Sequence, residues 1–338
     1  MPVTLAQAQL NTQDDIQAGV IDEFRKSSFI LDNLAFDQAV APTGNGGTLT
    51  YGYTRVLAEA GAATRAINAE YVPAEATKQR VTVDLAVFGG SYQIDRVLAK
   101  NTAALVDEIV FQTQQHSKST RSLFHDMFIN GDTAVDPNAF DGLDAAVTGT
   151  TTECLPLANG FASGYLDMST AADIAANAKA FAWLLDQWLL SFGDKPSALM
   201  GNSKLIAVIK AVAREMGYYT QSEDAFGRKV DNYDSIPLVD MGDKPASVLP
   251  VCPYNTRDTD GAGPGGNITG LADLFGCVFG LDAVHGVAPI GVPSDLVQVW
   301  LPDFSTAGAV KTGECEMVGC VAIKKTRGAG VLRNIKVQ

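Results

Sequence analysis

The pattern of apolar and polar positions changes several times along this chain of 338 residues. Residues 48–57 and 81–88 alternate as strands do, and Leu49, Tyr51 and Tyr53 fall on one side of the first run. The stretch between the two runs is rich in Ala, Thr, Glu and Arg and has few large apolar side chains. This pattern predicts a long β-hairpin with a poorly buried tip. Because an isolated hairpin is marginally stable in water, we expect it to pack on something outside its own subunit.

Residues 95–129 carry apolar side chains three, four or seven positions apart, which predicts one long helix. The middle of this segment, residues 112–122, has no large apolar side chain, so the helix is expected to span a protein surface rather than fill a core. Upstream, the spacing within residues 20–34 predicts one or two short helices on an N-terminal arm. Residues 42–47 then form a breaker.

Helix and strand patterns alternate after the long helix. One helix is capped by Thr170, a short strand follows at residues 197–201, and a second helix runs from Asn202–Ser203 to Gly217. These elements predict an inserted α/β domain, followed by a loop at residues 253–270. Strand-like runs then return at 275–284, 296–301, 314–324 and 331–337, and we expect this C-terminal part to pack beside the long helix. The predicted fold class is α+β.

The formal net charge is −13, which disfavours sequence-specific nucleic-acid binding because the chain gains nothing from displacing phosphate counterions. The C-terminal tail is a local exception with five positive charges and no acid: Lys324, Lys325, Arg327, Arg333 and Lys336. We expect a solvated strand edge guarded by these charges. The alternative is a face that pairs with acidic neighbours.

The five cysteines are an odd number, and no basic and apolar leader opens the sequence, so reduced thiols in a cytosolic product are expected. Cys315 and Cys320 lie five positions apart on a predicted strand and should face opposite ways, each as a core thiol. The sequence has no apolar run long enough for a transmembrane helix.

The segment FINGDTAVDPNAFDGL, residues 128–143, gathers four candidate oxygen donors: Asn130, Asp132, Asp136 and Asp141. It fails as a calcium loop, because counting from Asn130 the position that requires glycine is Val135 and a ligand position is Ala134.

The same segment fits the end of a helix better. Asn130 and Gly131 are expected to supply a positive-φ exit, and Asp132 and Asp136 to make turns through their side-chain oxygens. Phe140 and Leu143 then re-enter the core around a tight Gly142. We therefore predict a structural joint formed by Asn130, Gly131, Asp132, Phe140, Asp141, Gly142 and Leu143.

Other candidate motifs lack the context that their chemistry needs. The run GAGPGG, residues 261–266, has the spelling of a dinucleotide fingerprint, but no buried strand precedes it and Pro264 interrupts it. No phosphate loop precedes Lys311, and the three histidines are too scattered to suggest a zinc site. No nucleophile, base and orienting group are visible together, so no catalytic, cofactor-binding or metal-binding residue is expected, and the protein is predicted not to be an enzyme.

The order of these parts resembles the major capsid protein of tailed bacteriophages, with the Hong Kong 97 fold. The resemblance rests on the acidic arm, the hairpin, the long helix ending in Asn130-Gly131-Asp132, the run Phe140-Asp141-Gly142-Leu143, the inserted domain and the returning strands. It implies an N-terminal arm at 1–40, an extended E-loop hairpin at 41–92, and a spine helix with the first part of the peripheral (P) domain at 93–169. It further implies an axial (A) domain at 170–290 and return strands of the P domain at 291–338.

The resemblance also implies a function. Copies would assemble as hexamers and pentamers into an icosahedral shell around double-stranded DNA, which they contact non-specifically. The expected location is the virion, after synthesis in the host bacterial cytoplasm. The implied partners are the protein itself, a portal, a scaffolding protein that is separate because the arm is short, and decoration proteins, with no membrane.

Lys78 is the only lysine between residues 46 and 92 and lies away from the expected tip, so no covalent cross-link through the hairpin is predicted. Two alternatives remain. One is an encapsulin-type nanocompartment shell, which shares the fold and packages enzymes. The other is an enzyme that uses the carboxylates of residues 130–141.

Overall fold

The computed structural model describes residues 29–40, 48–99, 108–217, 220–223, 229–261, 266–291 and 297–338. Its α-helices are α2 (Phe29–Asn33), α3 (Arg96–Ala99), α4 (Glu108–Asn130), α5 (Leu143–Val147), α6 (Ala171–Leu189) and α7 (Ser203–Glu215). Its strands in the first half are β1 (Phe36–Val40), β2 (Thr50–Ala58), β3 (Thr77–Asp84), β4 (Ala86–Asp95), β5 (Glu153–Cys154) and β6 (Leu166–Asp167). The later strands are β7 (Ala198–Gly201), β8 (Thr220–Glu223), β9 (Lys229–Tyr233), β10 (Ile236–Asp240), β11 (Asn255–Asp258), β12 (Asn267–Cys277), β13 (Val284–Pro289), β14 (Val297–Trp300), β15 (Val310–Ile323) and β16 (Ala329–Lys336).

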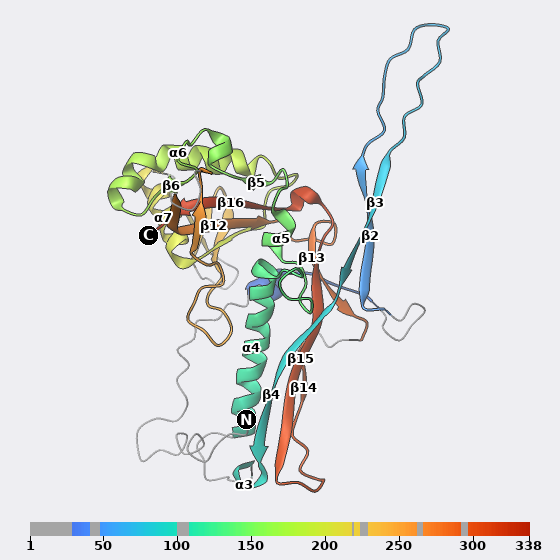
Figure 1. Ribbon diagram of the computed structural model, residues 1–338, viewed down its shortest axis with the longest axis vertical. Helices are drawn as coiled ribbons and strands as arrows, with labels where there is room; N and C mark the ends of the chain where they lie inside the picture. Colours follow the sequence, from blue (N-terminus) through green and yellow to red (C-terminus); the bar gives the residue numbers. More distant parts are fainter. Residues whose placement is uncertain are drawn as a thin grey trace.

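The molecule has three visible parts (Figure 1). A layered α/β body carries α6 and α7, and a long strip formed by α4 and its neighbouring strands extends away from this body. The hairpin formed by β2 and β3 projects from the junction of the two, pointing away from the strip. The shape is elongated, so much of the chain lies far from any single core.

The predicted hairpin is present. Strands β2 and β3 pair antiparallel from Thr50↔Asp84 to Ala58↔Thr77, and residues 59–76 beyond them are all exposed. Only Tyr51, Tyr53 and Arg55 on β2 and Val81 and Val83 on β3 are partly covered, on one face near the root. The second strand begins and ends four residues earlier than the predicted 81–88 run, because the chain changes neighbours at Leu85 and continues as β4.

The strip is built on the long pairing of β4 with β15, which runs from Ala86↔Gly319 to Asp95↔Val310. β14 and β13 pair with the other edge of β15, and β1 adds to β13 in parallel. Helix α4 packs along β4 and β15, as expected of a helix with a mostly polar middle. Gly90 lets it approach closely, since a Cβ there would lie 2.8 Å from Nδ1 of His116.

The predicted helix at 95–129 is wrong at its start. Asp95 is still a strand residue paired with Val310, and its carboxylate accepts the backbone N–H of Val97 to begin the short α3. Residues 100–107 lie outside the described part of the chain. The described helix α4 has 23 residues and is about 35 Å long.

The α/β body contains the larger sheet, with strand order β5-β16-β12-β7-β10-β9-β8. Helices α6 and α7 pack on it through their apolar stripes, and Thr170 and Asn202 cap them as the sequence predicts. β11 pairs with β12 at Asn255↔Leu271, so the predicted 253–270 loop is instead partly a hairpin. Its apolar strand neighbours make this pairing favourable although the turn itself is polar.

Strand β16 is the main surprise, because the predicted segments assign it to the strip. Its residues Ala329–Ile335 are all buried and it pairs with β12, which places it centrally in the sheet of the α/β body. Conversely β13, within the predicted 170–290 segment, pairs with β15 in the strip. Only β14 and β15 follow the expectation that the C-terminal part packs beside the long helix. β16 lies in the α/β body because a fully buried strand needs neighbours on both faces.

Only part of the basic tail is the predicted solvated edge, because Lys325 and Arg327 are exposed whereas Arg333 is buried. Arg333 on β16 is 6% exposed and forms ion pairs with Asp144, Glu153 and Asp273. Asp273, 4% exposed, also receives two hydrogen bonds from the guanidinium of Arg257 at 2.7 and 2.8 Å. The alternative reading, pairing with acidic neighbours, is realised within the chain because removing these charges from water requires partners of opposite sign.

The structure buries all five cysteines, including Cys315 and Cys320 on β15, as predicted for core thiols. Burial raises the pKa of the Cys154 thiol to about 11 and that of Cys320 to about 12. Of the predicted arm at 1–40, the structure describes residues 29–40, which form α2 and β1; residues 1–28 and the breaker at 42–47 lie outside the described residues.

Candidate functional site

The end of helix α4 is anchored to two other parts of the chain. Phe124 and Phe128 are fully buried, and the Phe124 ring lies between Phe88 at 6.1 Å and Phe140 at 5.8 Å, measured between ring centroids. The side-chain amide of Asn130 donates to the Asp126 carboxylate and to the backbone carbonyl of Val251, both at 2.7 Å. The helix end is therefore held by apolar packing on one side and by a polar contact with the α/β body on the other.

The backbone crosses itself closely where the helix ends. Gly131 donates to the carbonyl of Met127 at 2.9 Å, and Gly142 donates to the carbonyl of Gly131 at 2.8 Å. A Cβ at Gly131 would lie 2.2 Å from the carbonyl oxygen of Phe140, and one at Gly142 would lie 2.5 Å from that of Met127. Both glycines are thus required by the close approach of two backbone segments.

The predicted positive-φ exit at Asn130 and Gly131 is wrong. Neither residue is among the described positions with positive φ. The helix leaves through an ordinary backbone conformation, and glycine is needed there for space rather than for a left-handed turn.

Aspartate side chains shape the loop between the two glycines. Asp132 accepts the backbone N–H of Ala134 at 2.8 Å and Asp136 accepts that of Asn138 at 3.0 Å, as the sequence predicts for Asx turns. Asp141 accepts from both the backbone N–H and the hydroxyl of Thr133, at 2.9 and 2.8 Å, and so closes the loop. Each of the three carboxylates thus accepts a hydrogen bond from a backbone N–H of the loop itself.

The chain then re-enters the core. Phe140 and Leu143 are buried, and α5 begins at Leu143. Asp144 on α5 lies 2.7 Å from Nη1 of Arg333, which links this corner to the central strand of the α/β body.

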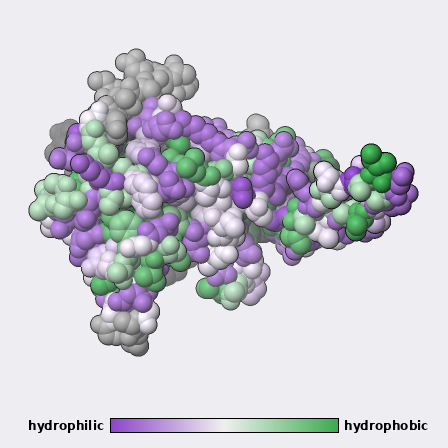
Figure 2. All heavy atoms as spheres, turned by 90° about the horizontal axis from the view of Figure 1, so that it is seen from above, coloured by the Kyte–Doolittle hydropathy of each residue, from purple (hydrophilic) through white to green (hydrophobic). Residues whose placement is uncertain are grey.

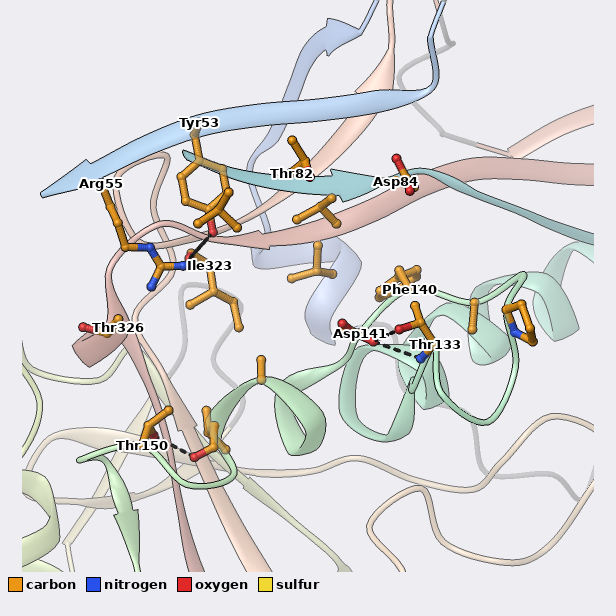
Figure 3. A pocket seen from close by; sticks show the side chains of 17 residues that line it. Tyr53, Arg55, Thr82, Asp84, Thr133, Phe140, Asp141, Thr150, Ile323 and Thr326 are labelled. Carbon is orange, nitrogen blue, oxygen red and sulfur yellow. Dashed lines mark hydrogen bonds between the residues drawn. The ribbon is translucent and has the colours of Figure 1, made fainter. Parts of the chain in front are cut away.

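A cleft of about 610 Å³ separates this corner from the root of the hairpin (Figure 3). Tyr53 and Arg55 line it from β2, while Thr133, Phe140 and Asp141 line it from the opposite side. The hydroxyl of Tyr53 donates to the carbonyl of Ile323 at 2.6 Å, and Arg55 donates to the same hydroxyl at 3.2 Å. The root is thus tied to the end of β15 by one tyrosine.

Sequence reasoning placed Tyr51 and Tyr53 on one face of the hairpin but missed their partners. It also missed Asp144, Asp273 and Arg333. The alternation of β2 could have indicated a covered face, whereas the ion pairs join residues 60 or more positions apart and leave no local signal.

Within the described residues, no group of three or more His, Cys, Asp or Glu side chains could hold a metal ion. Among the described helices, none combines the length and the apolar character that crossing a bilayer requires.

Replacing Gly131 with alanine should lower the free energy of unfolding by about 1–3 kcal/mol or more, because the new methyl group would overlap the carbonyl of Phe140. Urea denaturation of the unassembled protein measures the change. Gly61→Ala is the matched control, since a Cβ at Gly61 meets nothing within 4 Å. Equal stability of the two variants would contradict the close-approach role of Gly131.

His125 on α4 predicts a specific pH dependence. The side chain is 1% exposed, and burial lowers its pKa to about 4 against about 6.5 when unfolded. The unfolded chain therefore binds this proton first, and stability should fall as the pH drops from about 6.5 towards 4, by on the order of 3 kcal/mol at most. Comparing denaturation of wild type and His125→Leu over this pH range tests it; an unchanged slope in the variant would contradict it.

Comparisons with known proteins give structural matches only. No protein-family model matches the sequence, and no curated protein matches it.

Several solved structures match over nearly the full length of both chains. The holo-SrpI encapsulin complex from Synechococcus elongatus has a TM-score of 0.61 at 12% identity, covering 100% of this chain and 98% of that one. The capsid of Myoviridae phage XM1 has a TM-score of 0.57 at 12% identity, covering 98% and 99%. The capsid of a native GTA particle has a TM-score of 0.56 at 13% identity, covering 98% and 97%. At this identity the likeness defines the fold, and the chain has the predicted α+β Hong Kong 97-type capsid fold.

Proposed function

We propose that the protein is the major capsid protein of a tailed bacteriophage and assembles with copies of itself, as hexamers and pentamers, into an icosahedral shell around double-stranded DNA. Its likeness to phage and GTA capsids extends over the whole of both chains, rather than over one shared domain. The fold alone does not require this function, so the proposal needs a feature of this chain that calls for assembly.

The hairpin is that feature. Ile67 is 91% exposed and Val72 is 86% exposed, and Tyr71 beside them is also open to solvent. The green spheres near the end of the projection in Figure 2 show apolar side chains on a part of the molecule that no other element covers. A thin ribbon with an apolar end is unfavourable in water and becomes stable when another surface covers it.

Under this proposal the corner formed by Asn130, Gly131, Asp132, Phe140, Asp141, Gly142 and Leu143 acts as a structural joint between the long helix and the P domain. Its support is the glycine crossing, the closed loop and the link from Asp144 to Arg333. The chain has no enzymatic role, and it resides in the virion after synthesis in the host cytoplasm. The further partners would be a portal, a separate scaffolding protein, decoration proteins and DNA held without sequence preference.

A second candidate is the shell of an encapsulin-type nanocompartment, because one of the full-length matches is an encapsulin complex. The two functions differ in the contents of the shell. Nucleic acid inside particles purified from the native source supports the phage capsid, and a packaged enzyme supports the nanocompartment.

Replacing Ile67 or Val72 with aspartate should reduce shell formation without changing subunit stability. Burial of each apolar side chain in the assembly would contribute about 1.5–3 kcal/mol. Without it, the concentration needed for assembly should rise about tenfold or more. Electron microscopy and light scattering measure shells, and Thr64→Asp adds the same charge at the exposed tip without removing an apolar side chain. Failure of the wild-type protein to form shells under any assembly condition would refute the proposed function.

Asp132→Ala and Asp141→Ala separate the joint from the enzyme hypothesis. We expect fewer shells from both variants, since the loop they close would lose its fixed shape. Asp303→Ala is the control, because Asp303 makes a comparable turn with Ser305 in another loop. An assayable activity that disappears in a folded Asp141→Ala protein would instead support an enzyme, and equal assembly of all three variants would contradict the joint.

A further inference from the structure

His285 lies on β13 in an unusual environment. Its side chain is fully buried, and within the described residues neither ring nitrogen has a hydrogen-bond partner. The backbone carbonyl of Ala283 lies nearby without the geometry of a hydrogen bond to either nitrogen. A buried, unsatisfied imidazole is costly and calls for an explanation.

The ring of His285 touches the root of the hairpin. It meets the ring of Tyr51 on β2 edge to face, with 5.8 Å between centroids. The hydroxyl of Tyr51 donates to the Asp37 carboxylate on β1 at 3.0 Å, and Nζ of Lys324 lies 5.6 Å from the centre of the same ring. Tyr51 is therefore held by β1, β13 and the residue that follows β15.

Tyr53 and Val83 also pack against the apolar core at the root. Tyr53 donates to the carbonyl of Ile323 at 2.6 Å, and the backbone N–H of Leu85 donates to the carbonyl of Leu49 at 2.8 Å. The rest of the ribbon extends into solvent (Figure 1). The Tyr51 cluster, defined as Tyr51, His285, Lys324 and Asp37, thus supplies much of the attachment between the hairpin and the body.

A proton on His285 would weaken this cluster. It would place a second positive charge close to that of Lys324, in a fully buried site where the backbone of Ala283 and the Asp37 carboxylate offset that charge only in part. Burial first, and then the charge of Lys324, lower the pKa of His285, and the carboxylates of Asp37 and Asp282 oppose this only in part. The attached root therefore favours neutral His285, and the detached root, where the ring meets water, favours the protonated form.

We propose that His285 makes the root of the hairpin acid-sensitive, so that its protonation releases Tyr51 and frees the hairpin from the body. Its role in a shell rests on the proposed function, because there the hairpin is the part that covers a neighbouring copy. Acid would then change how each copy presents its hairpin while leaving the α/β body folded.

Hydrogen exchange of the unassembled wild-type protein tests this inference, with rates corrected for the intrinsic effect of pH. As the pH falls below about 6.5, the opening constant at residues 49–53 and 81–85 should rise, by at most about tenfold per pH unit because one proton is involved. His285→Phe keeps an aromatic ring against Tyr51 and cannot titrate in this range, so its root should show no such rise.

The chain has three histidines, which allows matched controls. His116→Gln and His125→Leu should keep the transition at the root, since neither side chain lies in the Tyr51 cluster. Lys324→Gln should make the acid-driven rise at the root smaller, because it removes a charge that lowers the pKa of His285 in the attached root.

The same rise in His285→Phe, or a pH-independent root in wild type, would overturn the inference. If His285→Phe does not fold, the inference is tested by the changed pH dependence of the opening constant in Lys324→Gln, together with the titration of the His285 ring followed by NMR in wild type. Because all readouts use the unassembled chain, a failure to form shells would count against the proposed function and leave this test intact.

Discussion

The buried carboxylate of Asp273 holds together segments that the chain brings from far apart. It accepts from Arg257 on β11 and lies beside Arg333 and Asn334 on β16, while Arg333 in turn reaches Asp144 on α5 and Glu153 on β5. Breaking one partner of such a buried set leaves charges uncompensated, so these residues act as a unit. Through Asp144 the unit extends to the crossing of Gly131 and Gly142, and from there to α4 and the strip along it. The position of the strip relative to the α/β body depends on this sequence of contacts.

The hairpin stands outside that unit. The body satisfies its own charges and buries its apolar side chains in two clusters, whereas residues 59–76 are exposed throughout and carry apolar groups at their end. A subunit of this kind is complete in one part and incomplete in another. The contacts that fold it lie within the chain, whereas the apolar surface left at the end of the hairpin is typical of a surface that another molecule covers. That division is what a shell-forming protein needs, because it must fold alone before it assembles.

Alternation and spacing were sufficient to predict the hairpin, helices α6 and α7, and strands β14 and β15. They depend on neighbours along the chain, and a sequence pattern records those directly. The pairing partners of β13 and β16 could not be predicted this way, since buried strands read as similar apolar runs whichever sheet receives them. At the candidate joint, the Asx turns of Asp132 and Asp136 followed from local chemistry. Glycine at 131 was predicted for a positive φ, which is not the reason it is needed. The carbonyl that excludes a side chain there belongs to Phe140, which comes close to Gly131 only in the folded chain.

The central place of β16 bears on the timing of folding. This strand is synthesised after both β5 and β12, yet it lies between them and carries Arg333. Until it has left the ribosome, Asp273 and Asp144 lack their contact with Arg333 and β12 has an open edge. The N-terminal hairpin and long helix emerge much earlier, but they cannot take their final positions on the body before then. Copies of the chain in which β16 has not yet been synthesised therefore cannot complete the sheet of the α/β body.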